Sequence, residues 1–195
     1  MGNDKLFFNA PIEFLLAHEQ LLEQYPVNAE VFVDGEDLER IDGNKVERVR
    51  RLFEEKGLKR RVHGPISEMT LGAFDPRIRE VCLSRFVQAI EFADAIGAES
   101  VTLHSGFDML NKRGCEDRYR ENLVSSLRFL SGEAAKRGKR LMLENTFEPV
   151  PDLLCDSLAM VGAENLKLCF DVAHHRVFGK APLDEWLRRC APSIE

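Results

Sequence analysis

Polar side chains of the kinds that bind metal ions recur at the ends of short apolar runs along this sequence. They comprise two asparagines, three acidic residues, two histidines and a further histidine three residues after the last aspartate: Asn9, Glu30, His63, His104, Glu144, Asn145, Asp171 and His174. Imidazole favours transition metals, and carboxylate oxygens accept several divalent ions. If the runs come together in space, two histidines with Glu144 and Asp171 are a suitable ligand set for Zn²⁺ or Mn²⁺.

These residues support the metal hypothesis unequally. Glu144 and Asp171 each follow an apolar run that must be buried, and a charged group is almost never buried without a partner. A single histidine at a strand end is more often a hydrogen-bonded structural residue than a ligand. The histidines therefore support a metal site only because such residues recur in successive strands. Asn9 is equally explained as the cap of the following helix, and Glu30 as a solvated or salt-bridged residue.

An alternation of short apolar runs with longer helical patterns must position these side chains. The apolar runs cover residues 6–8, 29–33, 61–63, 100–104, 140–144 and 166–171. Periodicity and capping residues predict helices over 11–25, 44–57, 75–97, 116–137, 151–161 and from 182 onward. Six strand–helix units without hairpin signals predict an α/β fold with a parallel sheet, right-handed crossovers and helices outside it. Residues 193–195 stand where a seventh strand would begin.

Two parallel architectures compete for this pattern, a doubly wound sheet and a (β/α)8 barrel. A doubly wound sheet usually has a glycine-rich first turn for a nucleotide phosphate, and Asn9-Ala10-Pro11 does not supply one. In a barrel the functional side chains cluster at the C-terminal ends of the strands, as the polar residues do here. The sequence therefore favours the barrel, in which the strand ends surround one cavity.

The composition is typical of one globular domain over residues 1–195. Lys and Arg number 27 against 33 Asp and Glu, a net charge of −6. This balance disfavours a nucleic-acid partner, and the basic runs at 59–61 and 136–140 lie at the opposite ends of the strands. No run approaches the ~20 apolar residues of a membrane helix and no signal peptide is evident, which predicts a cytoplasmic protein without a membrane partner. The five cysteines lack C-x-x-C spacing and predict reduced thiols.

Four segments at the predicted strand ends resemble the xylose isomerase-like TIM barrels, which include sugar isomerases, epimerases and endonuclease IV. The segments are Val62-His63-Gly64-Pro65, Thr102-Leu103-His104-Ser105-Gly106, Leu143-Glu144-Asn145-Thr146 and Cys169-Phe170-Asp171-Val172-Ala173-His174. The resemblance covers essentially the whole chain in the right order, with the third to sixth strands carrying the motifs. It implies a (β/α)8 TIM barrel that is incomplete here, with six βα units and the last two strands absent.

The resemblance also implies roles for the matching residues. Glu144 and Asp171 would be metal ligands, and Glu144 would move a proton at the carbon next to a substrate carbonyl. His174 would contact the substrate or a further metal. His63 and His104 would line the mouth, as ligands of an additional metal together with Glu144 where a second ion exists.

We assign Asn145, Glu30 and Asn9 to the substrate-binding side of the site. The implied cofactor is a divalent metal, Zn²⁺ or Mn²⁺ first, with Mg²⁺ or Co²⁺ as alternatives. The leading hypothesis is a metal-dependent isomerase or epimerase acting on a small sugar or a polyol-derived carbonyl compound. The alternatives are a zinc phosphodiesterase acting on abasic DNA and a non-catalytic metal-binding remnant of the fold.

Relatives of this kind complete the metal shell with a histidine on the seventh strand and a glutamate on the eighth, and the sequence ends before both. We therefore expect a C-terminally truncated barrel. Its first and sixth strands would each leave an edge and apolar surface exposed, which favours homo-oligomers formed through the open edges.

Overall fold

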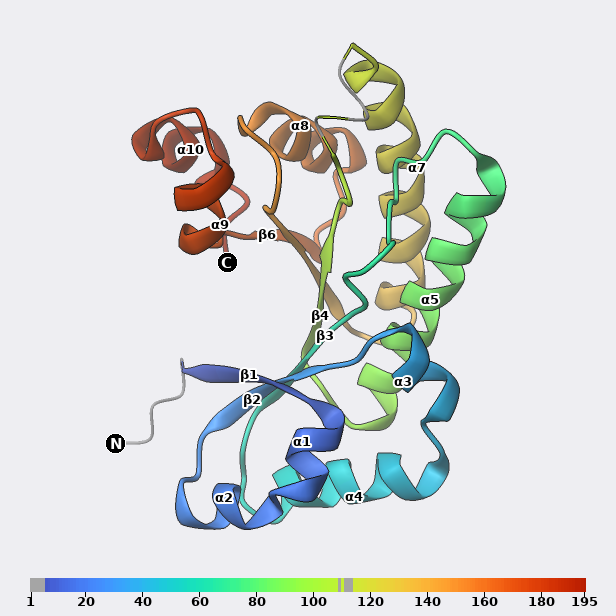
Figure 1. Cartoon of the computed structure of the whole chain (residues 1–195), viewed down its shortest axis with the longest axis vertical. Helices are drawn as coiled ribbons and strands as arrows, with labels where there is room; N and C mark the ends of the chain where they lie inside the picture. Colours follow the sequence, from blue (N-terminus) through green and yellow to red (C-terminus); the bar gives the residue numbers. More distant parts are fainter. Residues whose placement is uncertain (1–5, 109, 111–113) are drawn as a thin grey trace.

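The computed structural model describes residues 6–108, 110 and 114–195, and shows helices packed around a parallel sheet (Figure 1). The strands are β1 (Phe7–Pro11), β2 (Asn28–Phe32), β3 (Arg60–His63), β4 (Ser100–His104), β5 (Arg140–Glu144) and β6 (Leu166–Cys169). The helices are α1 (Ile12–Ala17), α2 (Glu19–Gln24), α3 (Gly35–Arg40), α4 (Gly43–Glu54), α5 (Pro76–Ala95), α7 (Glu116–Ala135), α8 (Asp152–Val161), α9 (Val172–Phe178) and α10 (Leu183–Cys190). The strands pair in parallel in the order β1-β2-β3-β4-β5-β6, which confirms the predicted alternation.

Three local features differ from the prediction. The helix expected over 11–25 is divided into α1 and α2 at His18, whose φ of −129° and ψ of 37° lie outside the helical region. Helices α3 and α9 were not predicted. They follow Asp34 and Asp171, whose carboxylates accept hydrogen bonds from backbone N–H groups of the first turn. Both helices are short, so a cap rather than an apolar period marks where they begin.

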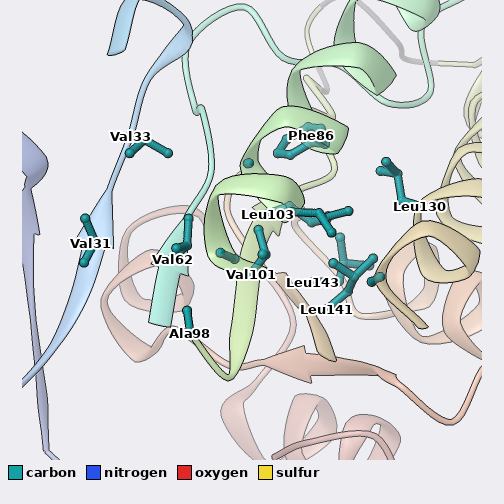
Figure 2. Close-up of a cluster of buried hydrophobic side chains, with 14 of the residues drawn as sticks. Val31, Val33, Val62, Phe86, Ala98, Val101, Leu103, Leu130, Leu141 and Leu143 are labelled. Carbon is teal, nitrogen blue, oxygen red and sulfur yellow. The ribbon is translucent and has the colours of Figure 1, made fainter. Parts of the chain in front are cut away.

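Alternate side chains of each strand form an aliphatic face that packs on the helices. Val62, Val101 and Leu141 are each 0% exposed. Figure 2 shows them in one cluster with Phe86 of α5 and Leu130 of α7. Fully burying one such side chain contributes about 1.5–3 kcal/mol. This face therefore holds the helices on the sheet and leaves the remaining strand residues for the other face.

The other face of the sheet is polar and concave. Thr102 of β4 donates a hydrogen bond of 2.6 Å to Oε1 of Glu30 on β2, across the intervening strand β3. Neighbouring strands lie about 4.8 Å apart, so side chains two strands away meet only if the sheet curves toward them. The curvature brings the strand ends toward a common mouth, as in the wall of a barrel.

Beyond α10 the chain returns beside β6. Leu168 N–H donates to Ser193 O at 2.7 Å, and Glu195 N–H donates to Leu168 O at 3.2 Å. Leu168 and Ile194 form a parallel bridge. An isolated parallel bridge thus lies where the sequence predicts the start of a seventh strand.

One cysteine pair corrects the prediction of reduced thiols. Cys155 of α8 and Cys190 of α10 form a disulfide with their Cα atoms 5.9 Å apart. Cys82, Cys115 and Cys169 are free. The packing of α8 on α10 brings together two residues that lie 35 positions apart. No local spacing could have revealed this pairing.

In the part of the chain that the structure describes, no helix combines the length and the apolar character needed to cross a membrane. The cytoplasmic location expected from the sequence stays a prediction.

The loops that follow β3 and β4 are in close contact at Gly106. This residue has a φ of 71°. A Cβ atom there would overlap the carbonyl oxygen of Met69. Glycine is therefore required twice, by the left-handed backbone and by the neighbouring loop.

We expect Gly106→Ala to lower the free energy of unfolding by about 2–5 kcal/mol, combining left-handed strain with overpacking. Gly138→Ala is the matched control, because Gly138 has a φ of 64° and no atom of the described residues lies within 4 Å of an added Cβ. The control should lose only about 1–2 kcal/mol. Urea denaturation measures both values, and equal losses would contradict the loop contact.

Candidate functional site

Three of the predicted ligands lie at the carboxyl ends of neighbouring strands. His63 is the last residue of β3, His104 of β4 and Glu144 of β5. Their exposed fractions are 5%, 5% and 7%. Each follows a buried aliphatic residue that faces the helices, so strand alternation turns the ligand side chain to the concave face. His104 and Glu144 stand directly opposite each other in the β4–β5 register.

The imidazoles of His63 and His104 flank the Glu144 carboxylate. His63 Nε2 lies 3.7 Å from Oε2, and His104 Nε2 lies 3.6 Å from Oε1. One potential ligand atom from each residue lies within 4.8 Å of the others. His63 Nδ1 is 2.9 Å from the carbonyl oxygen of Gly64, which pairs with the ring as acceptor. In the neutral ring Nε2 then carries the lone pair that a metal needs.

These contacts shift two pKa values in opposite directions. Burial alone would raise the pKa of Glu144, but the interactions with His104 and His63 outweigh it and lower the pKa to about 2. Burial would lower the pKa of His63, but Glu144, Glu30 and the carbonyl of Gly64 outweigh it and raise the pKa. Glu144 is therefore an ionised carboxylate at neutral pH.

Asp171 and His174 form a second group with the same carboxylate. Asp171 caps α9 and accepts a hydrogen bond of 2.6 Å from the N–H of His174. His174 Nδ1 lies 3.2 Å from Glu144 Oε1 and 3.7 Å from Asp171 Oδ2. These three residues again offer ligand atoms within 4.8 Å of one another. Glu144 belongs to both groups and joins them.

Asn145 orients the second group through its backbone contacts. Its Nδ2 donates to Asp171 O at 2.9 Å, and its Oδ1 accepts from Asp171 N at 2.7 Å. Its carbonyl oxygen lies 2.9 Å from His174 Nδ1. Both polar groups of the Asn145 side chain are thus engaged by Asp171. The predicted contact of Asn145 with substrate stays a prediction.

Asn9 and Glu30 lie on the concave face, where Asn9 is exposed and Glu30 half-buried, and they belong to neither ligand group. Asn9 Nδ2 donates to Glu30 Oε2 at 3.1 Å. Glu30 pairs in register with Arg61, two residues before His63. The negative charge of Glu30 affects the site electrostatically, because it contributes to the raised pKa of His63. Direct contact of Asn9 or Glu30 with substrate stays a prediction.

A cavity of about 350 Å³ lies beside His104, between the loops that follow β3, β4 and β5. It is lined by Ile66, Glu68, Met69, Thr70, His104, Gly106, Phe107, Asp108, Thr146 and Phe147. The described lining contains no Lys or Arg. Among the described residues, none forms a hydrogen bond with the buried atoms Thr146 Oγ1 and His104 Nε2. Two residues of the cavity lining therefore each hold a buried polar atom that lacks a partner in the described part of the chain.

The buried His104 Nε2 tests whether these residues suit a metal. Its 3.6 Å separation from Glu144 Oε1 is too long for a hydrogen bond. An unsatisfied buried polar group costs about 1–3 kcal/mol, and a cation shared with Glu144 would give this nitrogen a partner. Imidazole nitrogen with carboxylate oxygen is a ligand set that Zn²⁺ and Mn²⁺ accept. The residues present fit a divalent metal ion.

Glu148 and Ser105 lie directly behind the site, and neither was among the site residues predicted from the sequence. They are 2% and 0% exposed, and the Ser105 hydroxyl donates to Glu148 Oε1. Burial raises the pKa of Glu148. Glu148 lies in a loop, where neither strand alternation nor a helical period marks a buried position. Its one sequence signal is a carboxylate four residues after Glu144.

The low pKa of Glu144 predicts a pH dependence of stability. Its reference value is 4.5 and its folded value about 2, so the ionised carboxylate stabilises the fold above pH 4.5. This stability is lost as the pH falls through the folded pKa. We expect the difference in unfolding free energy between wild type and Glu144→Gln to fall from about pH 5 to about pH 3. Chemical denaturation measures it, with the exposed Glu121→Gln on α7 as the control substitution. A difference that stays constant would refute the shifted pKa.

Comparison with known proteins identifies relatives of the chain. Xylose isomerase-like TIM barrels match residues 28–192. The protein MJ1614 of Methanocaldococcus jannaschii is 26% identical over 159 residues, which cover 80% of this chain and 60% of that protein. The chain thus spans about 60% of the length of this curated relative.

Solved structures share the same fold. The TTHB071 protein from Thermus thermophilus, soaked with ZnCl2, has a TM-score of 0.80 and 29% identity over 94% of this chain and 73% of that one. A D-tagatose 3-epimerase-like protein has a TM-score of 0.76 and 20% identity over 97% of this chain and 73% of that one. The second likeness concerns the fold alone. Since the family match covers most of the chain and agrees with the parallel sheet and its strand-end site, this protein belongs to the xylose isomerase-like TIM barrel family.

Proposed function

We propose that this chain carries the metal site of a divalent-metal-dependent isomerase or epimerase, which moves a proton next to the carbonyl of a small sugar or polyol-derived substrate. The supporting observation is the ionised Glu144 carboxylate, which is shared by two ligand groups and lies 3.6 Å from His104, a residue of the cavity lining. Zn²⁺ or Mn²⁺ suits the mixed nitrogen and oxygen ligands best, with Mg²⁺ or Co²⁺ as alternatives. The fold likeness to an epimerase-like protein and the zinc-soaked TTHB071 structure support this choice.

Each residue of the site has a role in this proposal. Glu144 and Asp171 hold the metal, together with His63 and His104. When bound, the ion polarises adjacent carbonyl and hydroxyl oxygens of the substrate. Glu144, which is ionised at neutral pH, accepts the proton from the carbon next to the carbonyl; the electron pair passes to the carbonyl oxygen, and the proton is then returned to a substrate carbon. His174 binds a substrate oxygen through Nε2, since its Nδ1 is engaged by the carbonyl of Asn145.

The cavity beside His104 supports a small, uncharged substrate. Its volume of about 350 Å³ is near the lower end of small-molecule sites, about 300–1,000 Å³. A lining without described Lys or Arg does not favour a phosphodiester backbone. Ile66, Met69 and Phe107 provide apolar walls for the carbon chain. We therefore propose a sugar-like small molecule, and not nucleic acid, as the partner.

A two-metal hydrolase is the second candidate, because Glu144 belongs to both ligand groups. Paired metals in hydrolytic sites lie about 3.5–4 Å apart and activate water against a phosphate ester. A non-catalytic protein of the same fold would bind metal without turnover. Because the chain spans about 60% of the length of MJ1614, the activity of the whole protein is a proposal in each case.

Association of copies through the ends of the sheet is also a proposal. Strands β1 and β6 are the outer strands of the described sheet. Leu6 beside β1 is 60% exposed and Val177 of α9 is 70% exposed. Apolar surface next to a strand edge favours association.

Substitution of Glu144 tests both metal binding and proton transfer. We expect Glu144→Ala to lose all bound Zn²⁺ or Mn²⁺, because both groups lose their shared ligand. Glu144→Gln should abolish sugar turnover, because an amide cannot carry the proton. Elemental analysis and a sugar isomerisation assay measure the two effects, and Glu121→Gln should preserve both. Unchanged turnover in Glu144→Gln would exclude Glu144 as the proton carrier.

The number of bound ions separates the two candidate reactions. For the isomerase we expect one ion per chain, bound more weakly in both His63→Ala and Asp171→Ala, because both residues hold the same ion. For the hydrolase, His63→Ala would reduce two ions to one, because it removes a ligand of one group alone. Elemental analysis at saturating metal gives the counts. Two ions in the wild type would favour the hydrolase.

A further inference from the structure

We infer that Glu148 is a positioning residue for the metal centre: its buried carboxylate joins the loops after β4 and β5 and thereby sets the separation of His104 and Glu144. The inference rests on the proposed metal site. Glu148 belongs to neither ligand group, so its effect passes through the backbone of the two loops.

Each oxygen of the Glu148 carboxylate binds a different loop. The Ser105 hydroxyl donates to Oε1, and the N–H of Thr146 donates to Oε2 at 2.7 Å. Ser105 directly follows His104, and Thr146 lies two residues after Glu144. A single side chain therefore connects the backbone segments that carry two neighbouring ligands.

Ser105 extends this connection to the third loop and to α7. Phe107 N–H donates to Ser105 Oγ at 2.9 Å. The carbonyl oxygen of Ser105 accepts from Tyr119 Oη at 2.7 Å and from Leu71 N at 3.0 Å. Tyr119 Oη also lies 3.1 Å from Thr70 Oγ1. The loops that follow the three ligand-bearing strands are thus joined in one hydrogen-bonded network, which has Glu148 at its inner end.

Burial shows that this network is more than a surface contact. Glu148 is 2% exposed, and Ser105 and Tyr119 are each 0% exposed. Taking a carboxylate out of water is unfavourable, and an apolar side chain of similar size would fill the same space without that cost. Packing alone does not account for an acid here. Two acceptor oxygens that hold two loops do account for it.

Metal affinity depends on such outer contacts because they orient the ligands before the ion arrives. Removing residues that support metal ligands typically weakens affinity about 10–100-fold. We expect this loss in Glu148→Ala, which leaves the Ser105 hydroxyl and the Thr146 N–H without their acceptor. Glu148→Gln keeps the volume and one acceptor oxygen, so its loss should be intermediate.

The experiment titrates the full chain with Zn²⁺, in competition with a chromophoric chelator, and with Co²⁺, followed by visible absorption. Glu148→Ala should weaken Zn²⁺ binding about 10–100-fold at unchanged stoichiometry, and should alter the Co²⁺ spectrum because the coordination geometry changes. If Glu148→Ala does not fold, Glu148→Gln carries the test. Ser105→Ala removes the same contact from the other side, so its effect should not add fully to that of Glu148→Gln.

Val49→Ala is the control for a general loss of stability. Val49 is 0% exposed on α4, which packs on α1 and α5. This substitution should lower stability while leaving Zn²⁺ affinity within about twofold of wild type and the Co²⁺ spectrum intact.

Three results would overturn the role of Glu148, and one of them would also overturn the proposed function. If the wild type binds Zn²⁺ and Glu148→Ala binds it with the same affinity, the positioning role of Glu148 is excluded and the proposed function is not. An equal loss of affinity in Val49→Ala at matched stability also removes it, because the effect would then be general. A wild-type chain that binds neither Zn²⁺ nor Co²⁺ overturns the proposed function together with this inference.

Discussion

A buried carboxylate must have its charge compensated, and the structure meets this requirement at Glu144. The side chain is 7% exposed and remains ionised because histidines from β3, β4 and α9 surround it. Removing a partner of a buried charge typically costs about 3–5 kcal/mol, because the charge is left uncompensated in the interior. The ends of β3, β4 and β5 and the first turn of α9 therefore meet at the Glu144 carboxylate. The same arrangement places nitrogen and oxygen atoms where a divalent ion can bind.

The concave face makes that arrangement compatible with a stable fold. Strand alternation gives the aliphatic side chains to the helices and the polar ones to the interior of the curved sheet. Barrel interiors are usually filled by branched apolar residues, whereas here Asn9, Glu30 and Thr102 form a polar layer beneath the ligands. This layer contributes electrostatically as well, because Glu30 helps to raise the pKa of His63. The aliphatic side chains that stabilise the fold and the polar side chains of the site thus lie on opposite faces of the same strands.

Much of the fold follows from residue patterns, and the failures have physical causes. Long helices such as α5 and α7 bury a wide apolar face, so their periodicity predicts them. Short helices such as α3 and α9 depend on one aspartate cap, and the division at His18 depends on a single backbone conformation. The Cys155–Cys190 disulfide depends on the packing of two helices. Glu148 is buried in a loop, and loops have no hydrophobic periodicity that would mark a buried position in the sequence.

The order of residues alone was sufficient to predict the parallel strand–helix alternation, the family resemblance and the placement of His63, His104 and Glu144 at strand ends. These features are local or repeat along the chain, so hydrophobic periodicity and short motifs are sufficient to reveal them. Asp171 was predicted to end the sixth strand, but it lies two residues beyond β6, as the N-cap of α9. Three-dimensional packing was needed to show that Glu144 is shared by two ligand groups and that Asn145 binds the backbone of Asp171. It was also needed to show that Glu148 stands behind the site. Such contacts join segments that are remote in the sequence, and only the curvature of the sheet and the course of its loops bring them within hydrogen-bonding distance.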